Sequence, residues 1–194
     1  MSKVDDTNDT KRLIIDAAIR VLKTFGMEGL TMRKVALEAD MSLGNLQYHY
    51  ANKAILISAL AEHYFGECER LLDEYEHQPN TSRQHQLRSL ILYHLDHVEH
   101  ITDMCRIFRE MWALATRDEA LHEQLMSYYR VTFNKLTVLI GAMDVTKKQA
   151  KQIASFFIPF LEGYSITVHA ELQSKAQTVK MLVRICECLI DSGT

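Results

Sequence analysis

The sequence predicts an all-α protein of about nine helices, in which a small N-terminal module of short helices precedes a C-terminal bundle of long ones. The 194 residues include only 2 Pro and 7 Gly, whereas an all-β chain needs a turn about every 8–12 residues. Apolar residues recur at helical spacing, and no useful segment alternates with the period of a strand. With 47% hydrophobic and 24% charged residues, the composition is that of a globular protein with a sizeable core.

The first predicted helix spans residues 9–25, because its apolar side chains recur at the i, i+3/i+4 spacing of one buried face. Asp9 or Thr10 can cap its start. Gly26 follows it at the place where a left-handed helix end is expected. This segment therefore predicts an amphipathic helix against which the next elements pack.

Two short helices joined by a tight turn follow. Thr31 is a good N-cap for a helix over residues 32–39, and Ser42 for a second helix that ends near Tyr50. Asp40 stands in the turn, which needs left-handed backbone angles. The pattern is typical of a helix-turn-helix unit, whose second helix enters the major groove of DNA.

The second helix of this unit has a face suited to a groove. Leu46 lies on the inner side, while Gly44, Gln47 and Tyr48 lie roughly opposite and Leu43 reaches outward from the helix end. Gly44 allows close approach of the backbone, Gln47 can pair with adenine, and Leu43 can touch a thymine methyl. The free N–H groups behind Ser42 suit a phosphate. The alternative is an ordinary solvated surface, on which Lys and Glu are more usual.

Charge is distributed unevenly along the chain, whose net charge is −3. Residues 10–55 carry seven basic and four acidic side chains, so this module is +3 and the remainder of the chain is −6. A basic end on an acidic body is expected when one small module meets phosphate. Arg33 and Lys53 bracket the second short helix and are candidates for phosphate contacts, and Arg33 also has the reach for a guanine.

Longer helices follow the module. Asn52 can cap a fourth helix to about residue 77, and Pro79 opens the clearest linker. Asp118 and Thr146 are further caps. Beyond the linker we predict helices over 84–101, 103–116, 118–141, 146–172 and 175–191. The expected domains are a DNA-binding domain at 1–51, a connecting helix at 52–78 and a regulatory domain at 79–194.

Pro159 lies inside a predicted long helix and predicts a kink with local unwinding. Gly141 is the expected end of the helix before it.

The segment GMEGLTMRKVALEADMSLGNLQYHYANKAILISAL resembles the N-terminal signature of TetR-family transcriptional regulators over about 45 residues. Three positions depart from the usual pattern, since Asp40 replaces a turn glycine, Gln47 a tyrosine and Tyr50 a phenylalanine. Carried over position by position, the resemblance implies DNA contacts from Thr31, Met32, Arg33, Leu43, Gly44, Asn45, Gln47, His49 and Lys53. Lys34, Ser42 and Tyr48 join this set as neighbouring basic, capping and exposed aromatic residues.

The resemblance also implies a mode of action. A TetR-family regulator would be a homodimer that holds two recognition helices about 34 Å apart on a palindromic operator. A small-molecule effector would release such a repressor by favouring a state with wrongly spaced helices, and the fourth helix is the natural lever.

The segment after residue 60 contains 13 of the 16 aromatic residues. Aromatic stripes usually form core, but this number of large side chains in a helical domain also suits an apolar ligand cavity. The candidate ligand-binding residues are Tyr93, His94, Phe108, Met111, Trp112, Tyr128, Phe133, Phe156, Phe160 and Tyr164. Candidate polar anchors are Arg106, Arg109, Arg130, His94 and Glu162.

His94, His97 and His100 are spaced by three residues, so a helical metal-binding enzyme or metal sensor is the alternative function. Solvated or core histidines are the commoner explanation, because three steps of three drift around a helix. The chain lacks paired Glu-x-x-His motifs, a nucleophile motif and a Gly-rich phosphate loop. We therefore expect no enzymatic activity, no catalytic residues, no metal and no cofactor besides an unknown effector.

The last two predicted helices have broad apolar faces, which a four-helix bundle with a second subunit would bury; burial within one subunit is the alternative. The two rows are Ile153, Phe156, Phe157, Phe160 and Leu161, and Val179, Leu182, Val183, Cys186 and Leu189. The polar N-terminus lacks the apolar stretch of a signal peptide, and no run of 18 apolar residues exists. We expect a cytoplasmic protein that does not enter a membrane.

Overall fold

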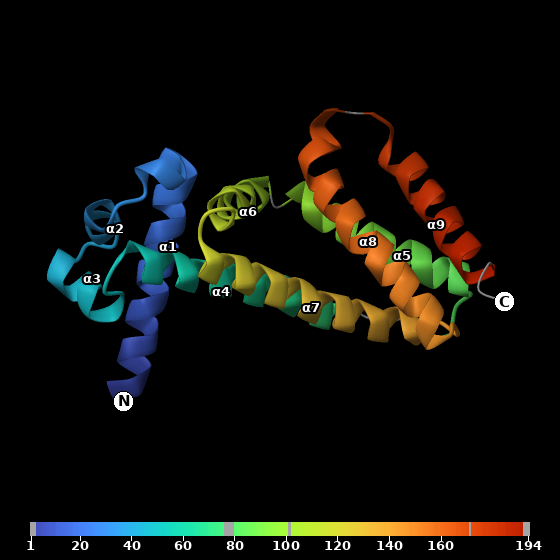
Figure 1. Ribbon diagram of the computed structural model, residues 1–194, viewed down its shortest axis with the longest axis horizontal. Helices are drawn as coiled ribbons and strands as arrows, with labels where there is room; N and C mark the ends of the chain where they lie inside the picture. Colours follow the sequence, from blue (N-terminus) through green and yellow to red (C-terminus); the bar gives the residue numbers. More distant parts are fainter. Residues whose placement is uncertain (1–2, 76–79, 101, 171, 192–194) are drawn as a thin grey trace. The chain divides into compact units, whose positions relative to one another are not determined.

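A computed structural model describes residues 3–75, 80–100, 102–170 and 172–191, and these residues form nine α-helices and one short 3₁₀ turn without a strand (Figure 1). The fold class predicted from the sequence is therefore confirmed. The helices are α1 (Lys3–Gly29), α2 (Met32–Glu38), α3 (Leu43–His49), α4 (Lys53–Glu74), α5 (Arg83–His100), α6 (Thr102–Ala115), α7 (Glu119–Gly141), α8 (Lys147–Thr167) and α9 (Lys175–Asp191), with the 3₁₀ turn at Val168–Ala170.

Contacts divide the chain into two compact units. Unit 1 comprises Met1–Glu67 and Arg106–Met126, and unit 2 comprises Cys68–Cys105 and Ser127–Thr194. Helices α4, α6 and α7 each contribute residues to both units. The two units are defined by contacts between residues and not by function. The functional domains with boundaries at residues 51 and 78 therefore stay a prediction.

The helix-turn-helix module of unit 1, made of α1, α2 and α3, is built on α1. Ile14, Ala18 and Leu22 on one face of α1 are buried, as are Val35 of α2 and Leu46 of α3. Helix α1 begins at Lys3, earlier than predicted. Because these side chains are closely packed, truncating Ile14, Leu22 or Leu46 would leave a cavity in a small core. The packing of α3 through Leu46 therefore holds this helix against α1 and α2.

Gly26 has the positive φ that its place in the sequence predicts, with φ 65° and ψ −176°. These angles are not helical, so the first helix stops at this kink, and a separate helical turn beyond it ends at Gly29. The predicted helix end at residue 25 is therefore confirmed, and the sequence reasoning missed only the short turn that follows.

Unit 2 is organised around α5, which packs against both α8 and α9. Its core includes Leu95 of α5, Phe157 of α8 and Leu182 of α9, each at most 2% exposed. Thr146 and Gln149 form a capping box at the start of α8, and the Gln149 side chain also donates to the Ile190 carbonyl at 2.6 Å. This bond ties the first turn of α8 to the last turn of α9.

The expectation that α8 and α9 bury their apolar rows against a second subunit needs correction. Most of both rows is buried within the single chain, because α5 covers the two helices; these residues are Ile153, Phe157, Val179, Leu182, Val183 and Cys186. Phe156, Phe160, Leu161 and Leu189 are only partly buried. The alternative of burial inside one subunit therefore holds for the greater part of these faces.

The predicted unwinding at Pro159 is also not observed, since α8 is one continuous α-helix through this residue. A proline in a helix removes one N–H donor, and the rest of the helix keeps its hydrogen bonds. Among the described helices, none is both long and apolar enough to cross a bilayer.

Candidate DNA-binding surface and effector site

The helix-turn-helix has the caps and the turn that the sequence predicts. The Thr31 side chain accepts the Lys34 N–H at 3.2 Å, and the Ser42 side chain accepts the Asn45 N–H at 3.1 Å. Asp40 adopts a left-handed φ of 53° in the turn. These local bonds fix the start of α3 and leave its first N–H groups at the surface.

The recognition face, defined as Gly44, Asn45, Gln47 and Tyr48 of α3, is exposed. Tyr48 is 83% exposed, and its ring meets the His49 ring edge to face at 5.2 Å. On the opposite side of α3, Leu46 is fully buried, as the pattern predicts. A Cβ added at Gly44 would meet nothing within 4 Å, so this position is open to whatever approaches α3.

Four basic side chains of the module, Arg20, Arg33, Lys34 and Lys53, differ in the contacts that they make. Arg33 is exposed and has no hydrogen bond or ion pair to any described residue. Lys34 instead places its ammonium 4.2 Å from the centroid of the Phe25 ring, and Lys53 donates to the Met27 carbonyl at 3.1 Å. Arg20 pairs with Glu38 at 2.6 Å. Arg33 is therefore the cation of this set that the fold leaves free for phosphate, and the assigned contacts of Lys34 and Lys53 stay predictions.

Sequence reasoning missed Glu110 of α6. Its carboxylate accepts the backbone N–H of Met27, next to the kink at Gly26. Because Lys53 binds the carbonyl of the same residue, the Met27 peptide groups are held from α4 and from α6 at once. No local signal identifies Glu110, because it lies 83 residues from Met27 in the sequence.

The ten candidate ligand-binding residues do not gather in one compact unit. Phe108, Met111 and Trp112 belong to unit 1, where the Phe108 ring stacks on Tyr64 with centroids 4.9 Å apart and Met111 is fully buried. The other seven belong to unit 2 and are Tyr93, His94, Tyr128, Phe133, Phe156, Phe160 and Tyr164. Their role in ligand binding stays a prediction, and the aromatic density alone did not show this division.

Along α8, Phe156, Phe160 and Tyr164 form a stacked ladder with ring centroids 6.2 and 5.9 Å apart. The Tyr164 hydroxyl donates to the Glu99 carboxylate at 2.8 Å. Burial, together with this carboxylate, raises the pKa of Tyr164 to about 12. The last ring of this stack, Tyr164, therefore has a hydroxyl that stays protonated at neutral pH.

Polar groups also lie inside unit 2 near Tyr128. Burial raises the pKa of the Tyr128 hydroxyl, and the thiol of Cys68 acts in the same direction. Burial likewise raises the pKa of Glu162, and a hydrogen bond with Tyr129 partly opposes this. Cys68 and Tyr129 carried no sequence signal that separated them from core residues. Of the other proposed anchors, the side chain of Arg106 lies outside the described ones.

His94 of α5 is a neutral, partly buried histidine. Its Nδ1 lies 2.8 Å from the Leu90 carbonyl oxygen. Burial lowers the pKa of His94 to about 4; the hydrogen bond to Leu90 opposes this and His97 reinforces it. Its Nε2 is buried and has no hydrogen-bond partner among the described residues.

The structure gives no support to the metal-binding alternative. No group of three or more His, Cys, Asp or Glu side chains suited to a metal occurs within the part of the chain that the structure describes. The side chain of His100 lies outside that part.

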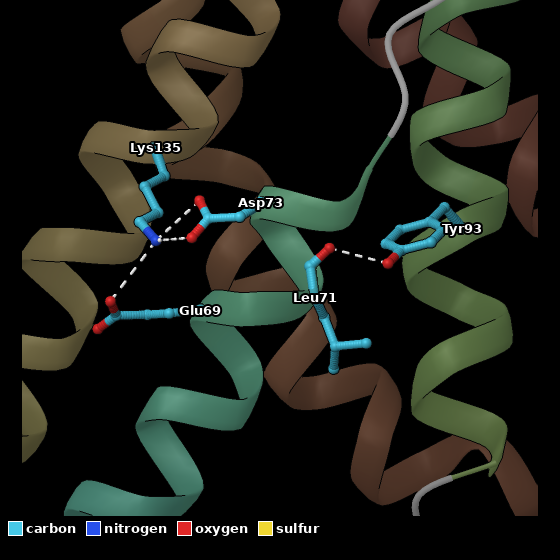
Figure 2. A network of polar contacts seen from close by, with 5 residues as sticks. All are labelled: Glu69, Leu71, Asp73, Tyr93 and Lys135. Atoms are coloured by element: carbon cyan, nitrogen blue, oxygen red, sulfur yellow. Dashed lines mark hydrogen bonds and ion pairs between the residues drawn. The ribbon is translucent and has the colours of Figure 1, made fainter.

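The C-terminal part of α4 is tied to α7 and α5 within unit 2 (Figure 2). The Lys135 ammonium donates to both carboxylate oxygens of Asp73 at 2.9 and 2.8 Å and lies 3.5 Å from Glu69. From α5, the Tyr93 hydroxyl donates to the Leu71 carbonyl at 2.8 Å. These contacts hold the end of the helix that was predicted to connect the two domains.

Comparison with known proteins matches the module to a family. Residues 14–60 match the family model described as "Bacterial regulatory proteins, tetR family". An uncharacterized HTH-type transcriptional regulator in the dhlA 5' region of Xanthobacter autotrophicus is 43% identical over 164 residues, which cover 83% of this chain and 80% of that protein. The HTH-type nicotine-responsive transcriptional repressor HdnoR of Paenarthrobacter nicotinovorans is 25% identical, over 85% of this chain and 86% of the repressor.

Solved structures share the whole fold. Salmonella enterica GusR superposes with a TM-score of 0.75 at 16% identity, covering 94% of this chain and 96% of GusR. A TetR transcription regulator from Haloarcula marismortui superposes with a TM-score of 0.74 at 18% identity, covering 95% and 98% of the two chains. At these identities the likeness concerns the fold alone.

Proposed function

Since the chain belongs to the TetR family of DNA-binding transcriptional regulators, we propose that it represses transcription from a palindromic operator until a small-molecule effector releases it. The observation that carries this proposal is the recognition face of α3, whose polar and small side chains are exposed above a buried Leu46. Gln47 can donate to and accept from adenine in the major groove, while Gly44 permits close approach. A regulator of this kind works in the compartment that holds the DNA and performs no catalysis.

A dimer is part of this proposal, because two recognition helices read two half-sites. On α8, Ser155, Pro159 and Gly163 are exposed at four-residue spacing, and the exposed Ile166 follows. This row carries no charge and has small side chains, so a helix of a second copy can approach it closely. The row differs from the apolar face that α5 already covers.

An effector acts by binding one of two conformations better than the other. HdnoR is named a nicotine-responsive repressor, which supports effector control in this chain. We place the effector in unit 2 and the transmission in α4, which starts at Lys53 beside Met27 and ends beside Lys135. A ligand that binds more tightly when the contacts of the α4 end with α5 and α7 are altered would favour that conformation. This difference in affinity between the two conformations is what control requires.

The DNA part is tested by selecting fragments of genomic DNA that the purified full chain retains, followed by footprinting. We expect a palindromic footprint with half-sites about one helical turn apart. Gln47→Ala should change the base preference within each half-site and leave circular dichroism unchanged. The matched control is Gln173→Ala, which removes an exposed amide of unit 2. Unchanged selectivity of Gln47→Ala would contradict groove readout by this residue.

The dimer is tested with two glycine variants. A Cβ at Gly163 or at Gly66 would meet nothing within 4 Å in the single chain, so arginine fits at both positions. Gly163→Arg should convert the protein to monomers in sedimentation and weaken operator binding, whereas Gly66→Arg should do neither. A dimeric Gly163→Arg variant would exclude this face of α8 from the interface.

A further inference from the structure

A hollow of about 400 Å³ lies within unit 1, between the last residues of α1 and helix α6. Residues 25–28 form one wall, and Glu110, Leu114 and Arg117 lie in the other. Pockets that hold small molecules commonly measure about 300–1,000 Å³. Among the described residues that line the hollow, none belongs to the ten candidate ligand-binding residues. The hollow is therefore a candidate for a second site, separate from the effector site placed in unit 2.

The hollow contains carboxylates beside Met27. Glu110 Oε2 accepts the Met27 N–H, whereas Oε1 makes no hydrogen bond to a described residue. Oε1 lies 3.3 Å from the position that a Cβ at Gly26 would take, so this glycine leaves the oxygen uncovered. Glu28, the residue after Met27, is exposed and adds a second carboxylate to the lining. Because ionised carboxylate oxygens only accept, an ammonium group is the ligand group that suits them best.

The hollow also contains a free cation, Arg117, seven residues after Glu110. The Arg117 side chain is exposed and makes no hydrogen bond or ion pair to any described residue. The turn after α6 stays close to helical, since the Arg117 N–H donates to the Leu114 carbonyl at 2.9 Å. At a rise of about 1.5 Å per residue, the backbones of Glu110 and Arg117 are therefore about 10 Å apart. A guanidinium suits a carboxylate, because it binds both oxygens through two parallel hydrogen bonds.

The lining between the two charges is apolar. Ala113 and Leu114 lie between Glu110 and Arg117 in the sequence, and the half-exposed ring of Phe25 faces the hollow from α1. An anion alone would meet the carboxylates without a counterion, and a cation alone would leave the guanidinium unpaired. A molecule with both charges and an apolar middle is complementary to all three parts of the lining.

We propose that this hollow binds amphipathic zwitterions, in which an apolar chain separates an ammonium group from a carboxylate group. The ammonium donates to Glu110 Oε1, the carboxylate accepts from the Arg117 guanidinium, and the chain contacts Leu114 and Phe25. Glu110 also holds the Met27 N–H, so an occupant contacts the same carboxylate that fixes the end of α1. Any effect on operator release rests on the proposed function, whereas binding itself does not.

The test is an NMR titration of the DNA-free full chain labelled with ¹⁵N-methionine. The Met27 amide is the reporter, because its N–H is bonded to Glu110. The probes are 6-aminohexanoate, hexanoate and hexylamine, which share the apolar chain and differ in their charges. We expect 6-aminohexanoate to shift the Met27 signal saturably. It should bind about three- to tenfold more tightly than either singly charged probe, the range of one partly exposed charged contact.

Two variants assign the two contacts. Glu110→Gln keeps an acceptor for the Met27 N–H and removes the charge, so 6-aminohexanoate should lose its advantage over hexanoate. Arg117→Gln should remove the advantage over hexylamine. Arg117 is exposed, so this second variant tests the site even if Glu110→Gln proves unstable in circular dichroism.

Matched controls remove the same charges elsewhere. Glu62→Gln and Arg88→Gln alter exposed residues and should keep the wild-type order of affinities. A Met27 signal that does not saturate, equal affinities for the three probes, or an order of affinities that survives in Arg117→Gln would each overturn the proposal. If operator selection fails while the preference for 6-aminohexanoate persists, the regulatory role falls and the binding site stands.

Discussion

The recognition face of α3 and the interior around His94 both present polar groups that the protein leaves without partners, but they do so under opposite conditions. Gln47 and Tyr48 are exposed, so water satisfies their polar groups and a partner could replace this water at little cost. His94 Nε2 and the Tyr75 hydroxyl are buried, so each is costly until a ligand or a trapped water arrives. The comparison shows that an unpaired polar group costs little at the surface of α3 and much more in the interior of unit 2.

The two regions also differ in how the chain builds them. The caps of α2 and α3 join residues three apart, as in Thr31 with Lys34 and Ser42 with Asn45. In unit 2, Tyr93 contacts Leu71 and Phe157 contacts His94, over 22 and more residues. The helix-turn-helix is thus shaped by contacts within its own segment, while the interior around His94 depends on the packing of α4, α5 and α8.

The largest effect is expected from filling the open space at Gly44. Gly44→Leu should fold normally, because a Cβ there meets nothing within 4 Å. It should weaken operator binding by more than about 100-fold, since a bulky side chain holds α3 out of the groove and several contacts worth about 1–3 kcal/mol each are lost. Mobility-shift titration measures the operator affinity. Gly66→Leu is the control, because a Cβ at Gly66 also meets nothing within 4 Å. If Gly44→Leu kept the wild-type operator affinity, the prediction that α3 approaches the DNA groove closely at this position would be wrong.

Acid should act on the buried region through His94. Its folded pKa of about 4 lies below its ordinary 6.5, so the unfolded chain binds the proton first. The stabilisation is complete above pH 6.5 and is lost as pH falls towards 4, by about 1.4 kcal/mol per pH unit and up to about 3 kcal/mol. His97 on the same helix adds to the effect.

Urea unfolding of wild type and His94→Phe at pH 7 and at pH 4.5 measures this difference. The variant should lose less free energy of unfolding on acidification than the wild type, whereas His169→Gln should behave as the wild type. Parallel losses in wild type and His94→Phe would show that His94 is not buried in its neutral form.

A smaller effect is expected at the start of α3. Ser42→Ala should lower the free energy of unfolding by about 1 kcal/mol, because the Asn45 N–H loses its acceptor. Thermal unfolding measures the change, and Ser127→Ala, at an exposed position within α7, provides the comparison. A Ser42→Ala variant as stable as wild type would mean that the cap contributes nothing.

The smallest effect is expected from Arg33. If the exposed guanidinium meets one phosphate, Arg33→Ala should lower the slope of log affinity against log salt by about 0.9, with modest loss of affinity. Arg20→Ala is the contrasting variant, because Arg20 is already paired with Glu38. A slope unchanged in Arg33→Ala would remove this residue from the set of phosphate contacts.

The all-α class, the order of the helices and the helix-turn-helix follow from the amino-acid sequence alone. The sequence also located the caps Thr31, Ser42, Asn52, Asp118 and Thr146, each of which the structure shows accepting an N–H three residues ahead. These features depend on hydrogen bonds and apolar spacing within one or two turns, which any short segment displays.

Which helices the apolar faces meet depends on how the chain packs in three dimensions. A periodic row predicts that a face is buried, and the packing shows that α5 lies against α8 and α9 where most of the two apolar rows are buried. The same holds for Glu110 at Met27, for Lys135 at Asp73 and for the buried lone pair of His94. Each depends on residues brought together from distant segments or on packing around them, so no local pattern encodes it.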